Sequence, residues 1–150
     1  MELQKELQQK SFKSEKQKLV LNVLFTAGWL DCMAIRKFKP HGLSPQQFNL
    51  LRILRGQSPK AVSANLIAGR MIDRKSNVSR LLDKLLLKGL VTRKENPEDR
   101  RAIQVSITSK GLQLLSKIDK EEPEWLESMN QIPEKEAKRA NEILDQLRKE

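Results

Sequence analysis

Side chains that can bind nucleic acid are concentrated in residues 70–111. Asn77 and Arg80 are of the types that read adenine and guanine edges in a groove. Arg100 and Arg101 follow a Pro-Glu-Asp sequence and suit a narrow minor groove, whose negative potential attracts arginine. The chemistry that this set favours is recognition of a double helix.

The side chains expected to contact DNA are basic, or short and polar: Arg74, Lys75, Ser76, Asn77, Ser79, Arg80, Lys84, Arg100 and Arg101. The two serines, the asparagine and Arg80 are expected to read bases, Lys75 and Lys84 suit phosphates, and Arg74 suits either. Two simpler interpretations compete: a solvated helix face with ion pairs such as Arg80 with Asp83, and a hairpin tip kept soluble by charge. The adjacency of the two basic features favours DNA binding.

Periodicity predicts the elements that position these residues. Residues 76–88 form a helix that Gly89 ends, and its inward face repeats at i, i+3, i+4 and i+7 through Val78, Leu81, Leu82 and Leu85. Residues 90–95 and 102–107 alternate as strands around a turn that contains Pro97. The pattern indicates a helix followed by a basic hairpin.

Five further segments are expected to be helices. One runs from somewhere in residues 5–14 to about Arg36 and is ended by residues 39–42. Ser44 and Gln47 form a capping box that starts a second helix, which stops at Gly56, and residues 63–71 form a short third. Later in the chain, Thr108 caps a helix that continues toward residues 125–129, and Pro133 opens the last one.

Charge is distributed unevenly along the 150 residues. The net charge is +10, of which residues 70–101 contribute +5, whereas residues 102–150 contribute −2. This reversal indicates a polyanion bound by one part of the molecule, and a basic surface kept for solubility is the weaker alternative. Only 4% of residues are aromatic, which favours helices over sheets.

The composition also limits which cellular compartment and which kinds of catalytic or metal site can be expected. With one cysteine there is no intrachain disulfide, and we do not expect the polar residues 1–18 to act as a signal sequence. No apolar run approaches the ~18 residues that a membrane span needs. We expect a cytoplasmic protein without membrane contact, and we find no catalytic set, metal-ligand set or phosphate loop, so we expect no enzyme activity and no cofactor.

Five short segments are similar to segments of one known family: residues 43–48 (LSPQQF), 77–85 (NVSRLLDKL), 88–93 (KGLVTR), 96–101 (NPEDRR) and 107–111 (ITSKG). Together, and in this order, they resemble the MarR family of winged helix-turn-helix transcriptional regulators over roughly residues 19–150. One departure is the segment 71–74, which has no glycine in the helix-turn-helix turn.

The resemblance implies a mainly α fold with a small two- to three-stranded β-hairpin wing. A winged helix-turn-helix DNA-binding domain would span residues 43–108, between dimerisation segments at 1–42 and 109–150. A homodimer would place two recognition helices in successive major grooves of a palindromic operator, ~34–36 Å apart. Asp99 would support the wing, and either Arg100 or Arg101 would enter the minor groove.

Family resemblance also suggests a small-molecule effector site. It would lie where the first, second and fifth helices meet the DNA-binding domain, with a wall made of aromatic and methionine side chains: Phe25, Trp29, Met33, Phe38 and Phe48. Such a stripe more often forms plain core. Cys32 is expected to be a buried structural thiol, with oxidation sensing as the alternative, and His41 to be a loop residue.

These inferences describe a sequence-specific, double-stranded DNA-binding regulator. We expect a repressor that a small-molecule or redox signal releases from DNA. The alternatives are a winged-helix protein-interaction module and a non-specific nucleic-acid binder without effector control.

Overall fold

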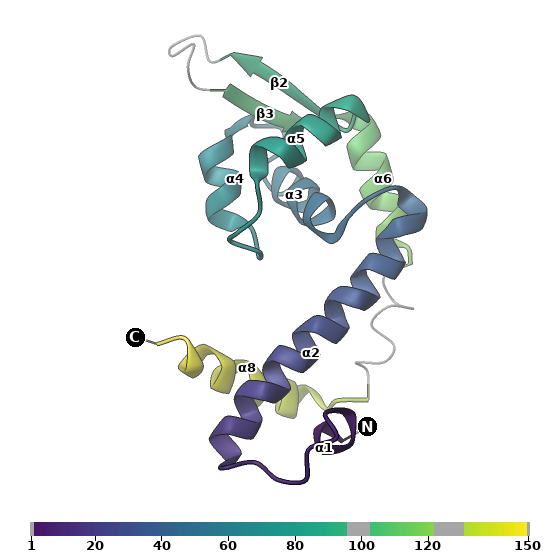
Figure 1. Ribbon diagram of the computed structural model, residues 1–150. Helices are drawn as coiled ribbons and strands as arrows, with labels where there is room; N and C mark the ends of the chain where they lie inside the picture. Colours follow the sequence, from purple (N-terminus) through teal and green to yellow (C-terminus); the bar gives the residue numbers. More distant parts are fainter. Residues whose placement is uncertain (1, 96–102, 122–130, 150) are drawn as a thin grey trace.

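A computed structural model describes residues 2–95, 103–121 and 131–149. The long helix α2 (Glu15–Phe38) joins two parts of the molecule (Figure 1). At its far end lie α1 (Leu3–Glu6) and α8 (Glu134–Leu147). The upper part contains α3 (Pro45–Arg55), β1 (Val62–Ser63), α4 (Ala64–Arg70), α5 (Val78–Leu87), β2 (Val91–Glu95), β3 (Ile103–Ile107) and α6 (Ser109–Asp119).

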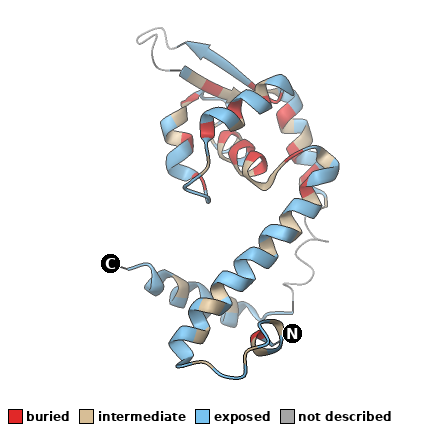
Figure 2. Cartoon of the chain, viewed as in Figure 1, coloured by how far each residue is buried: buried red, intermediate tan, exposed pale blue. Residues whose placement is uncertain are grey.

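Buried side chains are gathered almost entirely in the upper part (Figure 2). The most fully buried ones come from α3, α4, α5, β3 and α6: Leu50, Leu51, Leu54, Ile67, Leu82, Leu85, Val105, Leu115 and Ile118. By contrast, α2 has a single buried residue, Phe38, at the end that enters the core. The fold is thus one small core with a long helix that stands out from it.

Helix α2 begins one residue after Ser14, whose side chain caps it by accepting a hydrogen bond from the Gln17 N–H at 3.2 Å. The sequence predicted this helix with a somewhat earlier start and an end near Arg36. The chain then forms a short 3₁₀ helix, η1 (Lys39–His41), and turns at Gly42, whose φ of 68° favours glycine.

The predicted capping box at the start of α3 is confirmed. Ser44 Oγ accepts from the Gln47 N–H at 3.2 Å, and Gln47 Oε1 accepts from the Ser44 N–H at 3.1 Å. Phe38 stacks on Phe48 with ring centroids 4.0 Å apart, which fixes the end of α2 against α3.

The turn between α4 and α5 closes without glycine. Asn49 Oδ1 accepts from the Ile72 N–H, and Asp73 Oδ1 accepts from the Lys75 N–H, both at 3.0 Å. None of the residues in this turn has a positive φ. The turn therefore does not need the backbone freedom of a glycine, and the two side-chain acceptors hold it in place.

Helix α5 is shorter than the predicted 76–88, because Asn77 caps it from outside. Asn77 Oδ1 accepts from the Arg80 N–H at 3.0 Å. Gly89, with a φ of 68°, ends the helix as predicted. Of the predicted inward face, Val78, Leu82 and Leu85 are buried and Leu81 is half-buried.

The sheet has three antiparallel strands in the order β1-β3-β2. The predicted element order contained only the hairpin strands β2 and β3. The added strand, β1, pairs Val62 with Val105 and Ser63 with Gln104. Two residues are too few to show alternation, so the sequence pattern could not reveal this strand.

Thr108 caps α6, as predicted, by accepting from the Gly111 N–H at 3.1 Å. Its hydroxyl also donates to the Gly89 carbonyl at 2.8 Å, which links the ends of α5 and β3. The predicted continuation of this helix toward residues 125–129 lies outside the described residues.

One expectation about α2 needs correction. Together with η1 it forms a segment, Glu15–His41, that is long and apolar enough to cross a membrane by length and composition alone. Counting uninterrupted apolar runs missed it, because a window average tolerates interior polar residues such as Asn22 and Asp31. An apolar helix face that another protein chain covers would have the same composition.

Candidate nucleic-acid interface

The outer face of α5 borders an open hollow of about 400 Å³. Except for one leucine, every lining side chain is polar or charged: Gln46, Asp73, Ser76, Asn77, Arg80, Leu81 and Lys84. The start of α3, the turn before α5 and α5 itself contribute these residues. Four predicted site residues, Ser76, Asn77, Arg80 and Lys84, thus meet on one surface.

Arg80 and Lys84 are exposed, lie one helical turn apart, and make no ion pair within the described part of the chain. The competing interpretation paired Arg80 with Asp83. Instead, Asp83 bonds Arg93 of β2, with an N–O distance of 3.2 Å. Both cationic groups on the outer face of α5 are therefore left available for an anionic partner.

The polar residues at the start of α5 have different roles. The Asn77 oxygen is occupied by the helix cap, so the paired donor and acceptor contact with adenine is not available while the cap holds. Ser76 Oγ is buried and has no hydrogen-bond partner among the described residues. Ser79 is exposed beside Arg80. The geometry therefore favours Ser79 and Arg80 as the base-reading residues.

Lys75 and Arg74 lie on the turn and are exposed. The Arg74 guanidinium donates to the Gly69 carbonyl, which holds it against the end of α4. The wing residues Asp99, Arg100 and Arg101 lie outside the described residues. The strand that leads to them, β2, exposes Arg93 and Lys94.

Gln46 and Asp73 belong to the hollow and were not predicted as site residues. Asp73 could have been found as the side chain that closes a glycine-free turn. Gln46 carries no such signal, because its position depends on how α3 packs beside α5.

The predicted effector residues do not line one cavity. Phe38 and Phe48 stack in the core, and Met33 is half-buried. Phe25 and Trp29 of α2 line a separate pocket of about 310 Å³ between α2 and α1, and Leu3 of α1 also lines it.

A different pocket of about 470 Å³ lies between α2 and the helix-turn-helix unit. Its walls come from α2, α3 and the turn: Ala27, Leu30, Asp31, Ala34, Pro45, Gln46, Asn49, Met71, Ile72 and Asp73. Among them are small apolar residues on the periodic face of α2, and no aromatic residue is included. Selecting by aromatic character therefore did not identify the residues that line this pocket.

Two further expectations are wrong. Cys32 is exposed, because α2 stands out from the core and no element among the described residues covers most of its length. His41 belongs to η1, and its side chain is only 7% exposed, with Nε2 3.0 Å from a Glu121 carboxylate oxygen. Within the described ranges, no group of His, Cys, Asp and Glu could hold a metal ion.

The sequence and the fold of this chain are both similar to those of known proteins. Residues 43–103 match the model of the MarR family. A solved structure of a mutant MarR from E. coli, complexed with operator DNA, has the same fold, with a TM-score of 0.79 and 18% identity. The match covers 93% of this chain and 100% of that one.

Two curated relatives come from Bacillus subtilis (strain 168). The HTH-type transcriptional regulator YkoM is 33% identical over 85 residues, which are 57% of this chain and 54% of the relative, so the match spans about half of that protein. The HTH-type transcriptional regulator MhqR is 30% identical over 110 residues, which cover 71% of this chain and 73% of the relative. This protein therefore belongs to the MarR family of winged helix-turn-helix transcriptional regulators.

Proposed function

We propose that the protein is a homodimeric repressor that binds a specific palindromic site in double-stranded DNA. The observation that carries this proposal is the exposed outer face of α5, where Arg80 and Lys84 have no ion-pair partner within the described residues. Buried leucines on the opposite face and caps at both ends hold the helix rigid. The fold it shares with a regulator bound to operator DNA supports this use of the helix.

In this proposal α5 enters the major groove. Ser79 and Arg80 read bases, while Lys75 and Lys84 contact phosphates and fix the register. Arg100 or Arg101 would enter the adjacent minor groove. Occupation of the site would block transcription.

The substitution Arg80→Ala tests whether Arg80 reads bases. A palindromic duplex selected from a random library should bind the variant about 10- to 100-fold more weakly, because a good bidentate base contact discriminates by roughly 1–3 kcal/mol. Random duplex should be affected less, so the specificity ratio should fall. Fluorescence anisotropy measures both affinities, and Arg139→Ala on the exposed face of α8 is the matched control.

Two results with the unmodified protein would contradict the proposal. Equal affinity for selected and random duplexes would identify a non-specific nucleic-acid binder. No affinity for any duplex would favour a protein-interaction module.

Dimerisation is proposed from apolar surface that the described residues of this single chain leave uncovered. Leu24 is 65% exposed and Val20 48% on α2, and Leu147 is 48% exposed on α8. Helix α8 and most of α2 lie outside the small core (Figure 2). A second copy would cover them and set the distance between two DNA-reading units.

Leu24→Lys is expected to weaken the dimer at least about tenfold, because burying a leucine contributes roughly 1.5–3 kcal/mol. Asn22→Lys is the control, since it adds the same charge about 200° away around the helix. Sedimentation velocity across a micromolar dilution series measures the dimer constant. Equal weakening by both variants, or by neither, would place the interface elsewhere.

Release from DNA is proposed to act through the 470 Å³ pocket between α2 and the turn, whose volume suits a small molecule. Asp73 and Ile72 lie in its wall and belong to the turn that leads into α5. A ligand there would change the angle between α2 and the DNA-reading unit, so that two heads no longer match one operator. Oxidation of the exposed Cys32 is the alternative signal.

A further inference from the structure

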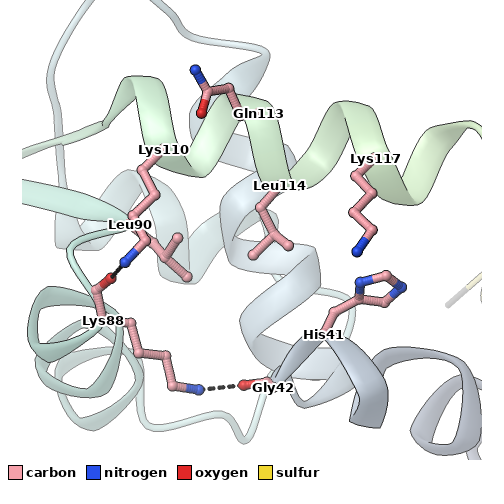
Figure 3. A pocket seen from close by; sticks show the side chains of 8 residues that line it. All are labelled: His41, Gly42, Lys88, Leu90, Lys110, Gln113, Leu114 and Lys117. Carbon is pink, nitrogen blue, oxygen red and sulfur yellow. Dashed lines mark hydrogen bonds between the residues drawn. The ribbon is translucent and has the colours of Figure 1, made fainter.

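We propose that Lys88 is a positioning residue that fixes the angle between the long helix α2 and the DNA-reading helix α5. Its ammonium group connects the end of α5 to the segment that follows α2 (Figure 3). The proposal rests on the repressor function proposed above and adds a residue that determines the spacing between the two operator half-sites. Its basis is a set of hydrogen bonds that meet at this one residue.

Both acceptors of the Lys88 ammonium group lie at the junction between α2 and α3. Lys88 Nζ donates to the Gly42 carbonyl and, at 3.2 Å, to Gln47 Oε1. Gly42 ends η1, which continues α2, and its N–H donates to the Lys39 carbonyl at 2.9 Å. Gln47 is only 5% exposed, and its side chain also accepts from the Ser44 N–H in the capping box of α3. Lys88 therefore bonds the turn into which α2 leads.

The main chain around Lys88 is bonded to α6 and its cap. The Lys88 carbonyl accepts from Lys110 Nζ, and the Gly89 carbonyl accepts from the Thr108 hydroxyl, both at 2.8 Å. Lys88 directly follows α5, and Leu85 in the last turn of that helix is buried. A displacement of the Lys88 main chain is therefore transmitted to the whole of α5, because the packed core does not let its last turn move alone.

A cavity of about 450 Å³ lies beside the bonds that Lys88 makes. Its walls come from the end of η1, the end of α5 and the outer face of α6, and the Lys88 side chain extends along it to Gly42 (Figure 3). Close packing would connect these elements through many small contacts, whereas beside a cavity the connection depends on the few side chains that cross the gap. Removing the Lys88 ammonium group should therefore loosen this junction.

A second set of bonds holds the end of α2 to the end of α6. His41 Nε2 lies 3.0 Å from a Glu121 carboxylate oxygen, and Lys37 Nζ donates to the Glu121 carbonyl at 2.9 Å. These bonds fix where α2 meets α6, and the bonds of Lys88 add a point of attachment on α5. Two points of attachment on different elements define an angle, which one point alone leaves free.

The angle between α2 and α5 matters because a dimer would hold two DNA-reading units at a set separation. Inserting one base pair between the half-sites moves them about 3.4 Å apart and rotates them by about 34–36°. A dimer with fixed units tolerates this change poorly, whereas a looser junction lets the units adapt. The bonds of Lys88 should therefore sharpen the choice of half-site spacing without changing which bases are read.

Lys88→Met tests this role, because methionine is also unbranched but has neither the charge nor the donors. Fluorescence anisotropy of the full chain compares the selected palindrome with two duplexes whose half-site spacing is one base pair longer or shorter. The preference for the selected spacing should fall about 3- to 30-fold in this variant. Affinity for a duplex with a single half-site should stay unchanged. Lys88→Arg, which keeps the charge and the donors, should retain most of the preference.

Lys120→Met is the matched control, since Lys120 is an exposed lysine at the end of α6 that makes no hydrogen bond to the junction within the described residues. An unchanged spacing preference in Lys88→Met would overturn the proposal, even if its urea midpoint fell, because the bonds would then serve stability alone. An equal loss of preference in Lys88→Arg or Lys120→Met would also overturn it.

Equal weakening of all four duplexes by Lys88→Met would overturn the proposal as well and would identify a DNA-backbone contact. Binding of the single half-site by the unmodified protein, compared with random duplex, reports on base reading and does not depend on spacing. Failure of the Lys88 proposal is therefore distinguishable from failure of the repressor proposal.

Discussion

Raising the salt concentration from 50 to 200 mM is expected to weaken binding of the selected palindrome by about 10³-fold or more. Each phosphate contacted by a lysine or arginine releases condensed counterions, so affinity falls steeply with salt. Each copy offers Lys75 and Lys84 beside α5, and the wing arginines Arg100 and Arg101 would add to them. Anisotropy titrations at four or five salt concentrations give the slope of log affinity against log salt.

Lys84→Gln should lower the magnitude of that slope by about 2, because a dimer loses two phosphate contacts at roughly 0.9 each. Arg139→Gln on α8 removes a positive charge from the other end of the chain and should leave the slope unchanged. A slope that Lys84→Gln does not alter would mean that this face of α5 does not contact the DNA backbone.

Gly111→Ala is expected to destabilise the protein by about 3 kcal/mol or more, a value typical of severe overpacking. A Cβ at this position would lie 2.5 Å from the Leu90 carbonyl oxygen and 2.7 Å from Ile107 Cγ1. The carbonyl cannot move freely, because it accepts a hydrogen bond from the Thr108 N–H at 3.0 Å. Space, and not backbone conformation, is what requires glycine here.

Gly69→Ala is the matched control for this substitution. A Cβ at Gly69 would meet no atom within 4 Å, and the residue lies in α4 of the same folded unit. Alanine should therefore leave stability unchanged or raise it by up to about 1 kcal/mol. Urea denaturation measures both variants, and equal midpoints would contradict the close approach of α6 to Leu90.

Local signals in the sequence predicted the ends of elements well. The Ser44 capping box, the Gly89 stop and the Thr108 cap each depend on a few neighbouring residues, and all three have the predicted geometry. Strand β1 depends instead on pairing Val62 with Val105, far away in the chain. No local pattern of two residues could predict that contact.

For the candidate site, residue types were predictable and their surroundings were not. The exposed positions of Arg80 and Lys84 followed from helical periodicity. The use of Asn77 as a cap and of Asp83 as the partner of Arg93 required the positions of neighbouring elements. The exposure of Cys32 depended on which parts of α2 the small core covers.

The attachment of α2 to the core at one end gives it the mechanics of a lever. Its 24 residues span about 36 Å at roughly 1.5 Å each, so a tilt of about 5° at the Phe38–Phe48 stack displaces the far end by about 3 Å. Substitutions along α2 should therefore change which spacing between the two operator half-sites the protein prefers. Substitutions on α5 should instead change which bases the protein recognises.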